Sequence, residues 1–153
     1  MNITIVGSGY VGLSLSALLS RDHSVIALDI DFERINKINK RIITFEDELL
    51  KNLFDNETLN LKATSNETEA YSLSDYIIIS APTNYNPDTN AFDVSIVESI
   101  IKNIILSGND CPIIIKSTVP VGFTEACRVK FAKKNIYFSP EFLREGRAVY
   151  DNM

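Results

Sequence analysis

The sequence predicts an α/β protein, with a doubly wound parallel sheet of about six strands in a three-layer α/β/α arrangement. Two observations support this fold class. Short apolar runs alternate with helical stretches along the 153 residues, and the runs at residues 77–79 and 113–115 consist of isoleucine alone. Uninterrupted apolar strands are typical of a parallel sheet that is covered on both faces. Right-handed βαβ connections then place the helices on those two faces.

The expected elements follow one another in regular order. Strand patterns occupy residues 3–6, 25–28, 61–63, 76–80, 113–116 and 136–138. Helical patterns occupy residues 11–20, 32–40, 46–54, 94–106 and 122–133. Residues 81–93 are the longest segment without a pattern, and their Pro, Asn and Asp residues predict turns. This segment follows the fourth strand, at the edge of the sheet where ligands bind in such folds, so it is either a plain loop or the rim of an active site.

A GxGxxG turn at residues 7–12 connects the first strand to the first helix. In this pattern Gly7 permits a tight turn, Gly9 lets a pyrophosphate approach the backbone, and Gly12 allows the helix to pack closely on the strand. The backbone N–H groups around Tyr10 and Val11, at the start of the helix, would face the phosphates. The turn therefore predicts a dinucleotide-binding Rossmann domain.

The second expected strand ends in Asp29, where the dinucleotide fingerprint places a carboxylate for the adenosine ribose. Asp29 would accept hydrogen bonds from the ribose hydroxyls and repel a 2′-phosphate, which favours NAD over NADP. Arg34 is close in sequence and would either weaken that discrimination or contact the ribose itself. The alternative is that the glycines are simple turn residues and that Asp29 is a helix N-cap.

Composition narrows the class of protein further. A net charge of −5 without a basic stripe argues against a nucleic-acid partner, and no apolar run has the roughly 18 residues that a membrane span needs. Two cysteines and a single histidine argue against a disulfide framework and against a metal site. The chain begins without a secretory signal pattern. We expect a cytoplasmic protein with one domain at residues 1–153.

Four segments carry a more specific pattern: Gly-Ser-Gly-Tyr-Val-Gly-Leu-Ser at residues 7–14, Ala-Pro-Thr-Asn at 81–84, Lys-Ser-Thr-Val-Pro-Val-Gly at 116–122 and Ser-Pro-Glu-Phe-Leu-Arg-Glu at 139–145. In their order and spacing the whole chain resembles the UDP-glucose/GDP-mannose dehydrogenase family. The resemblance implies oxidation of C6 of a nucleotide sugar from alcohol to carboxylate, with two NAD reduced per sugar. UDP-glucose, giving UDP-glucuronate, is the expected substrate, and UDP-N-acetylmannosamine or GDP-mannose is the alternative. The reaction would pass through a thiohemiacetal and a thioester on a cysteine.

The resemblance also assigns roles to residues. Thr118 would hydrogen-bond near the reacting C6 or the attacking water, Glu141 would be the base for thioester hydrolysis, and Glu145 would lie near nicotinamide and substrate. The full set of expected cofactor contacts is Gly7, Gly9, Tyr10, Val11, Gly12, Asp29, Arg34, Thr83, Thr118 and Glu145. The expected substrate contacts are Glu141, Phe142, Leu143, Arg144 and Glu145.

Helix capping explains two of these segments without any function. Ser117 or Thr118 would cap a helix led in by Pro120. Residues 139–141, Ser-Pro-Glu, have the pattern of a helix start, which would place Glu141 and Glu145 on one helix face at i,i+4. Two like charges at that spacing do not stabilise a helix, so a role in proton transfer would explain them better.

The family's nucleophilic cysteine lies downstream of the segment at residues 139–145, and neither Cys111 nor Cys127 takes its place by position. We therefore expect this chain alone to bind NAD and to be inactive, as a monomer or weak dimer, whereas the intact enzyme would be a homodimer. An alternative of another class is a nucleotide-sensing Rossmann module like the regulatory domains of potassium channels. A further alternative is a hydroxyacyl-CoA or phosphogluconate dehydrogenase. The sensing module leaves the segments at residues 116–122 and 139–145 unexplained, and the other dehydrogenase families lack the segment at residues 139–145.

Overall fold

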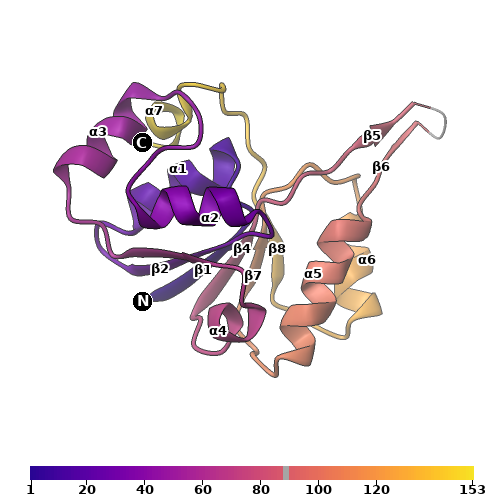
Figure 1. The fold of residues 1–153 in the computed structure, drawn as a ribbon. Coiled ribbons are helices and arrows are strands. Elements are labelled where there is room, and N and C mark those ends of the chain that lie inside the picture. Colours follow the sequence, from indigo (N-terminus) through magenta and orange to yellow (C-terminus); the bar gives the residue numbers. More distant parts are fainter. Residues whose placement is uncertain (88–89) are drawn as a thin grey trace.

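The computed structural model describes residues 1–87 and 90–153. Its main sheet has six parallel strands between two layers of helices (Figure 1). The strands are β1 (Asn2–Val6), β2 (Ser24–Leu28), β3 (Leu61–Thr64), β4 (Tyr76–Ile79), β7 (Ile113–Ile115) and β8 (Ile136–Phe138). Their order across the sheet is β3-β2-β1-β4-β7-β8. The chain thus winds outward in both directions from β1 and β4, which confirms the doubly wound fold predicted from the sequence.

Two sets of helices cover the two faces of the sheet (Figure 1). The first set is α1 (Tyr10–Leu19), α2 (Phe32–Asn39), α3 (Glu48–Asn56) and α7 (Ala148–Asn152), and the second is α4 (Glu67–Tyr71), α5 (Ser95–Leu106) and α6 (Phe123–Lys130). Strand side chains alternate between these layers. Ile77 and Ile79 pack with α4, α5 and α6, whereas Ile78 packs with Leu15 and Leu19 of α1. This alternation explains why β4 is apolar throughout.

The register brings the ends of neighbouring strands to one edge of the sheet. Val6 of β1 pairs with Leu28 of β2 and with Ile79 of β4. The residues that follow these strands, including Asp29 and Ser80, therefore emerge together at the carboxyl edge. This is the edge at which open α/β sheets bind their ligands.

Side-chain caps start several helices where the sequence supplies an Asp or Asn. Asp31 caps α2 by accepting from Glu33 N at 2.9 Å, so the alternative in which Asp29 is the N-cap is wrong. Asp47 caps α3 by accepting from Leu50 N at 3.0 Å. Its second oxygen accepts from Val149 N at 3.2 Å, which ties α7 to α3.

The segment at residues 139–147 is not helical, so the expected helix start at Ser139 is wrong. Two of its amides bond to side chains instead of to carbonyls one turn back: Phe142 N donates to Glu141 Oε1 at 3.3 Å and Arg144 N donates to Asp151 Oδ2 at 3.0 Å. Gly146 then turns the chain with a φ of +80°, and α7 begins only at Ala148. Glu141 and Glu145 consequently share no helix face.

Residues 81–93 contain a short antiparallel hairpin, so the expectation of a patternless loop there is also wrong. Strand β5 (Tyr85–Asn86) pairs with β6 (Ala91–Phe92), and the hairpin projects from the body of the protein (Figure 1). The rings of Tyr85 and Phe92 meet edge to face with centroids 5.4 Å apart. Strands of two residues are too short to leave a periodic pattern. Residues 88 and 89 of this segment lie outside the described residues.

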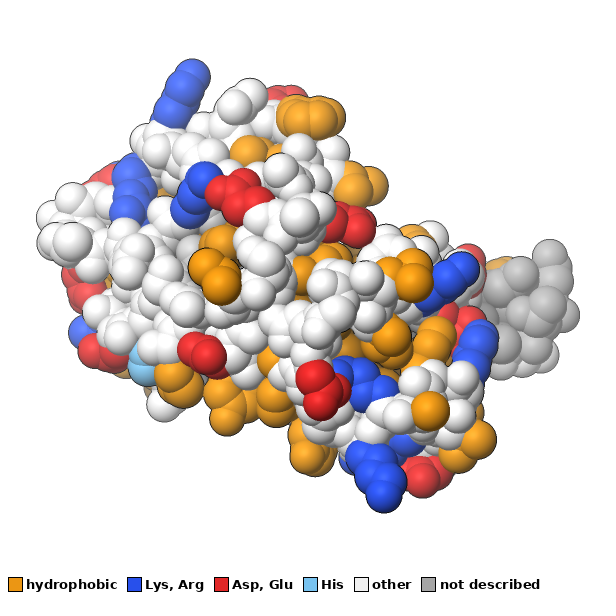
Figure 2. All heavy atoms as spheres, turned by 90° about the horizontal axis from the view of Figure 1, so that it is seen from below, with side chains coloured by type: hydrophobic (Ala, Val, Ile, Leu, Met, Phe, Trp, Pro, Cys, Tyr) orange, Lys and Arg blue, Asp and Glu red, His pale blue; other side chains and the backbone are white. Residues whose placement is uncertain are grey.

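The surface seen from below mixes side chains of all kinds. Figure 2 shows acidic and basic side chains interspersed on this face, with hydrophobic side chains between them. Throughout residues 1–87 and 90–153, each helix is too short or too polar to cross a membrane.

Candidate functional site

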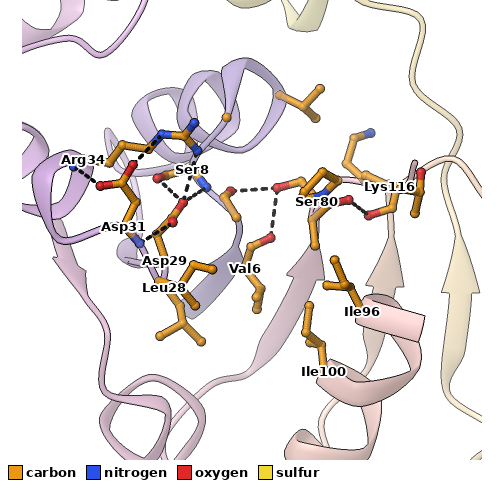
Figure 3. A pocket seen from close by; sticks show the side chains of 18 of the residues that line it. Val6, Ser8, Leu28, Asp29, Asp31, Arg34, Ser80, Ile96, Ile100 and Lys116 are labelled. Carbon is orange, nitrogen blue, oxygen red and sulfur yellow. Dashed lines mark hydrogen bonds and ion pairs between the residues drawn. The ribbon is translucent and has the colours of Figure 1, made fainter. Parts of the chain in front are cut away.

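A cavity of about 740 Å³ opens at the carboxyl edge of the sheet (Figure 3). It lies where the two halves of the sheet diverge, beyond the ends of β1 and β4. This is the topological switch point that forms a crevice in doubly wound folds. The sequence-predicted site residues among its lining are Gly7, Gly9, Tyr10, Val11, Asp29, Arg34, Thr83, Thr118, Glu141 and Leu143.

The turn after β1 requires two of its glycines for steric reasons. Gly7 has a φ of +93°, and a Cβ there would lie 2.8 Å from the carbonyl oxygen of Ser80. A Cβ on Gly12 would lie 1.8 Å from the carbonyl oxygen of Gly7. The Ser80 hydroxyl donates to the carbonyls of Val6 and Gly7, at 3.1 and 2.9 Å. The turn is therefore packed directly against the end of β4.

The start of α1 fits a pyrophosphate. The first bond within the helix runs from Leu13 N to Gly9 O at 2.9 Å, so the N–H groups of Tyr10, Val11 and Gly12 precede the helical ladder. Gly9 stands at the N-cap, and a Cβ placed on it would have no described atom within 4 Å. Backbone donors beside open space, at the positive end of a helix dipole, are what an anionic phosphate needs.

Asp29 is nearly fully buried, and its carboxylate accepts three hydrogen bonds from neighbouring residues. Oδ2 accepts from the N–H and the hydroxyl of Ser8, at 2.7 and 2.5 Å, and Oδ1 accepts from Asp31 N at 2.9 Å. Burial acts to raise the pKa of Asp29, but the hydrogen bonds from Ser8 and Asp31 outweigh it and hold the pKa below its ordinary value of 3.8. Because a carboxylate oxygen has two lone pairs, Oδ1 keeps the capacity to accept from a ribose hydroxyl.

Arg34 lies at the outer side of Asp29 (Figure 3). Its Nη1 is 3.8 Å from Asp29 Oδ2 and its Nε is 3.5 Å from Asp31 Oδ2. The guanidinium remains about half exposed. A positive charge is thus available beside the expected ribose position, where it would partly offset the repulsion of a 2′-phosphate by Asp29.

Apolar side chains form the walls of the cavity below Asp29. Leu28 of β2 faces Ile96 and Ile100 of α5 across the opening (Figure 3). Tyr71 of α4 also lines the cavity, and burial together with the charge of Glu67 raises the pKa of its hydroxyl. A slot with apolar walls fits the flat face of a nucleotide base.

Lys116 and Glu141 meet at the other end of the cavity, beyond the ends of β7 and β8. Lys116 Nζ lies 2.6 Å from Glu141 Oε2, and the side chains are only 12% and 14% exposed. Lys116 Nζ also donates to Ser139 Oγ at 3.3 Å. Oε2 accepts no well-aligned hydrogen bond from a described residue, so ionic attraction joins the pair. Both residues line the cavity.

Thr118 is exposed and lines the same end of the cavity. The alternative role for Ser117 or Thr118 as a helix cap is wrong, because Gly122 is the N-cap of α6. The hydroxyl of Ser117 instead donates to Ala81 O at 2.7 Å, which holds the loop after β4 against the loop after β7. Thr83 of that first loop lines the cavity as well.

Three residues expected to contact nicotinamide or substrate lie on the surface. Phe142, Arg144 and Glu145 are exposed and are not among the residues that line the described cavity. Arg144 is held by Asp151, with its Nε 3.0 Å from Oδ2, and this contact lowers the pKa of Asp151 to about 2. The roles expected for the three residues stay predictions.

Sequence reasoning did not single out Ser8, Ser80, Lys116, Ile96 and Ile100, although all five line the cavity. Ser8 occupies a position of the GxGxxG pattern at which any residue type is allowed. A signal for Lys116 was present, since it ends the fifth expected strand and Glu141 comes shortly after the sixth. The carboxyl ends of parallel neighbours meet at one edge, which brings such residues together.

Comparisons with known proteins agree with this arrangement. A model of the UDP-glucose/GDP-mannose dehydrogenase family, NAD binding domain, matches residues 1–153. The chain is 44% identical over 153 residues to a UDP-glucose 6-dehydrogenase of Streptococcus pneumoniae, and 43% identical over 155 residues to one of Campylobacter jejuni. Each alignment covers 100% of this chain and 39% of the relative. A ternary complex of GDP-mannose dehydrogenase from Pseudomonas aeruginosa superposes with a TM-score of 0.85 at 25% identity, covering 99% of this chain and 38% of that one.

Proposed function

The chain belongs to the UDP-glucose/GDP-mannose dehydrogenase family, and we propose that residues 1–153 are the NAD-binding domain of a UDP-glucose 6-dehydrogenase. One observation carries the proposal. A single cavity joins a dinucleotide site, with Asp29 at the ribose end, to Thr118, Lys116 and Glu141 at the other end. The 44% identity to a UDP-glucose 6-dehydrogenase supports UDP-glucose over other nucleotide sugars.

NAD supplies the redox chemistry in this proposal, because it accepts one hydride in each of two oxidations at C6 of the sugar. The chain itself binds and orients the reactants. The amides at the start of α1 hold the pyrophosphate, Asp29 accepts from the adenosine ribose, and the Thr118 hydroxyl orients the C6 oxygen or the attacking water. These contacts would place the sugar carbon at the end of the cavity that Thr118, Lys116 and Glu141 line.

Glu141 is the general base for the last step. A water oxygen attacks the thioester carbon, one proton of that water passes to the Glu141 carboxylate, and the carbon–sulfur bond breaks to release the thiolate and the sugar carboxylic acid. Cys111 and Cys127 do not suit the nucleophile. Both thiols are buried, and burial raises the pKa of each, that of Cys127 to about 11.

The nucleophile and most of the sugar site would then come from other parts of the enzyme. The chain spans 39% of the length of the two relatives described above, which leaves room for both. We propose that the intact enzyme is a cytoplasmic homodimer, and that this chain alone is a monomer or weak dimer that binds NAD without turnover. Two buried free thiols are in keeping with a reducing compartment.

The test is NADH formation by the intact protein with limiting UDP-glucose and excess NAD. We expect two NADH per UDP-glucose and UDP-glucuronate as the product. Turnover only with UDP-N-acetylmannosamine or GDP-mannose would keep the reaction and change the substrate. Tight NAD binding without turnover on any of the three sugars would refute the proposal and favour a nucleotide-sensing module.

A further inference from the structure

Resting on the proposed function, we propose that Lys116 is a positioning residue for Glu141. Its ammonium holds the carboxylate that takes the proton from the hydrolytic water. The contact of 2.6 Å between Lys116 Nζ and Glu141 Oε2 is the observation that carries this inference. Both side chains line the cavity that would hold the reactants.

The two residues differ in how firmly the fold holds them. The backbone of Lys116 continues the sheet, because its N–H donates to Ile79 O of the neighbouring strand at 2.8 Å. Glu141 lies in the irregular segment that follows Ser139. The lysine therefore provides a fixed point on the sheet, and the ion pair holds the carboxylate to it.

Stability alone gives little reason for this pair. Removing two charges from water costs free energy that their attraction does not always repay. The pair of Lys130 and Glu98 shows the contrast, since its N–O distance is 2.8 Å but its side chains are 55% and 33% exposed. A mostly buried pair inside a reactant cavity is better explained by the position it gives to a functional carboxylate.

The two carboxylate oxygens of Glu141 have different surroundings, which suggests a different role for each. Oε2 faces the Lys116 ammonium. Among the residues that the structure describes, Oε1 accepts one long bond of 3.3 Å, from the N–H of Phe142. We assign proton acceptance from water to Oε1, while Lys116 fixes the direction in which that oxygen points. Loss of Lys116 should then impair hydrolysis more than the preceding oxidations.

The test uses the intact enzyme with the variants Lys116→Met, Lys116→Arg, Glu141→Gln and the double variant Lys116→Met/Glu141→Gln. For Lys116→Met we expect a rapid burst of two NADH per site, then turnover slowed about 100-fold, with a covalent sugar adduct visible in the mass of the quenched protein. Lys116→Arg should restore turnover to within about tenfold of wild type, because it keeps the charge. The matched control Lys130→Met removes an exposed pair and should leave both phases unchanged.

The double variant separates positioning from an independent role. If Lys116 acts through Glu141, adding Lys116→Met to Glu141→Gln should change turnover less than about threefold. Effects that multiply would overturn the proposal, as would a Lys116→Met variant whose NAD affinity falls as much as its turnover. If the Lys116→Met variant fails to fold, the double variant, which carries neither charge, can still be compared with Glu141→Gln to test the proposal. A wild-type enzyme that makes no NADH from any nucleotide sugar refutes the proposed function itself, whereas wild-type turnover with normal hydrolysis by Lys116→Met refutes only the role of Lys116.

Discussion

The hydroxyl and the backbone N–H of Ser8 both donate to the same oxygen of Asp29, at 2.5 and 2.7 Å. This relationship joins the turn after β1 to the end of β2. It fixes the carboxylate in one orientation, in which the other oxygen accepts from Asp31 N at 2.9 Å. The glycine-rich turn therefore does more than approach a phosphate, because it also holds the group expected to bind the ribose.

Replacing Ser8 by alanine tests that link. The variant loses the hydroxyl donor to Asp29 but keeps the backbone N–H, so we expect NAD affinity to fall by about 0.5–1.5 kcal/mol. Isothermal titration of NAD into the chain measures this change. Ser107→Ala, an exposed serine at the C-terminal end of α5 that is not among the residues lining the cavity, is the control. Equal affinity of wild type and Ser8→Ala would mean that the hydroxyl does not position Asp29.

Two glycine substitutions should separate folding from binding. In Gly12→Ala the new Cβ would lie 1.8 Å from Gly7 O, so we expect a loss of about 3 kcal/mol in the free energy of unfolding. In Gly9→Ala the new Cβ meets open space, so the free energy of unfolding should change by less than about 1 kcal/mol. NAD affinity should nevertheless fall at least about tenfold, because the methyl group occupies the path of the pyrophosphate. Urea unfolding and NAD titration of both variants check the contrast, and a Gly9→Ala variant with full NAD affinity would contradict it.

Acid should weaken the contribution of Asp29 to stability. Hydrogen bonds from Ser8 and Asp31 outweigh burial and hold its folded-state pKa below 3.8, so the unfolded chain takes up the proton first as pH falls. The stabilisation is fully present above pH 3.8 and is lost as pH falls through the lower, folded-state value. The difference in unfolding free energy between wild type and Asp29→Asn should therefore shrink between neutral pH and about pH 3. A difference that stays constant over this range would show that the folded-state pKa is not lowered.

Replacing Glu141 by glutamine in the intact enzyme should slow thioester hydrolysis by about 10²–10⁴-fold and leave NAD affinity unchanged. The carboxamide keeps the size of the side chain but cannot accept the water proton. Rapid-quench measurement of the covalent adduct, alongside NAD titration, separates the two effects. Loss of NAD binding instead would mean that Glu141 supports the fold of the cavity.

The sequence allowed the central sheet and the dinucleotide end of the site to be predicted. Apolar runs such as residues 77–79 are diagnostic because both faces of the sheet are covered, and Asp29 follows a strand that pairs directly with β1. Both features can be recognised from a single segment and its neighbours along the chain. The connection rules for parallel sheets then predict correctly where in the sheet these strands and Asp29 lie.

The segment near Glu141 was harder to predict, because distant contacts override its local pattern. Ser139 and Pro140 have the composition of a helix start, but Asp151 takes the N–H of Arg144 and Gly146 turns the chain. The contact between Lys116 and Glu141 arises from the adjacency of β7 and β8. Such contacts depend on the order of strands in the sheet, which no single segment encodes.

The affinity of the Asp29→Ala variant for NAD and NADP, measured by titration, decides whether Asp29 binds the adenosine ribose. We expect NAD binding to weaken by about 1–3 kcal/mol and the preference for NAD over NADP to become smaller. The control variant Asp22→Ala, which changes an exposed aspartate after α1, should behave as wild type. A folded Asp29→Ala variant that binds NAD as tightly as wild type would contradict this role of Asp29, because the ribose would then lie elsewhere.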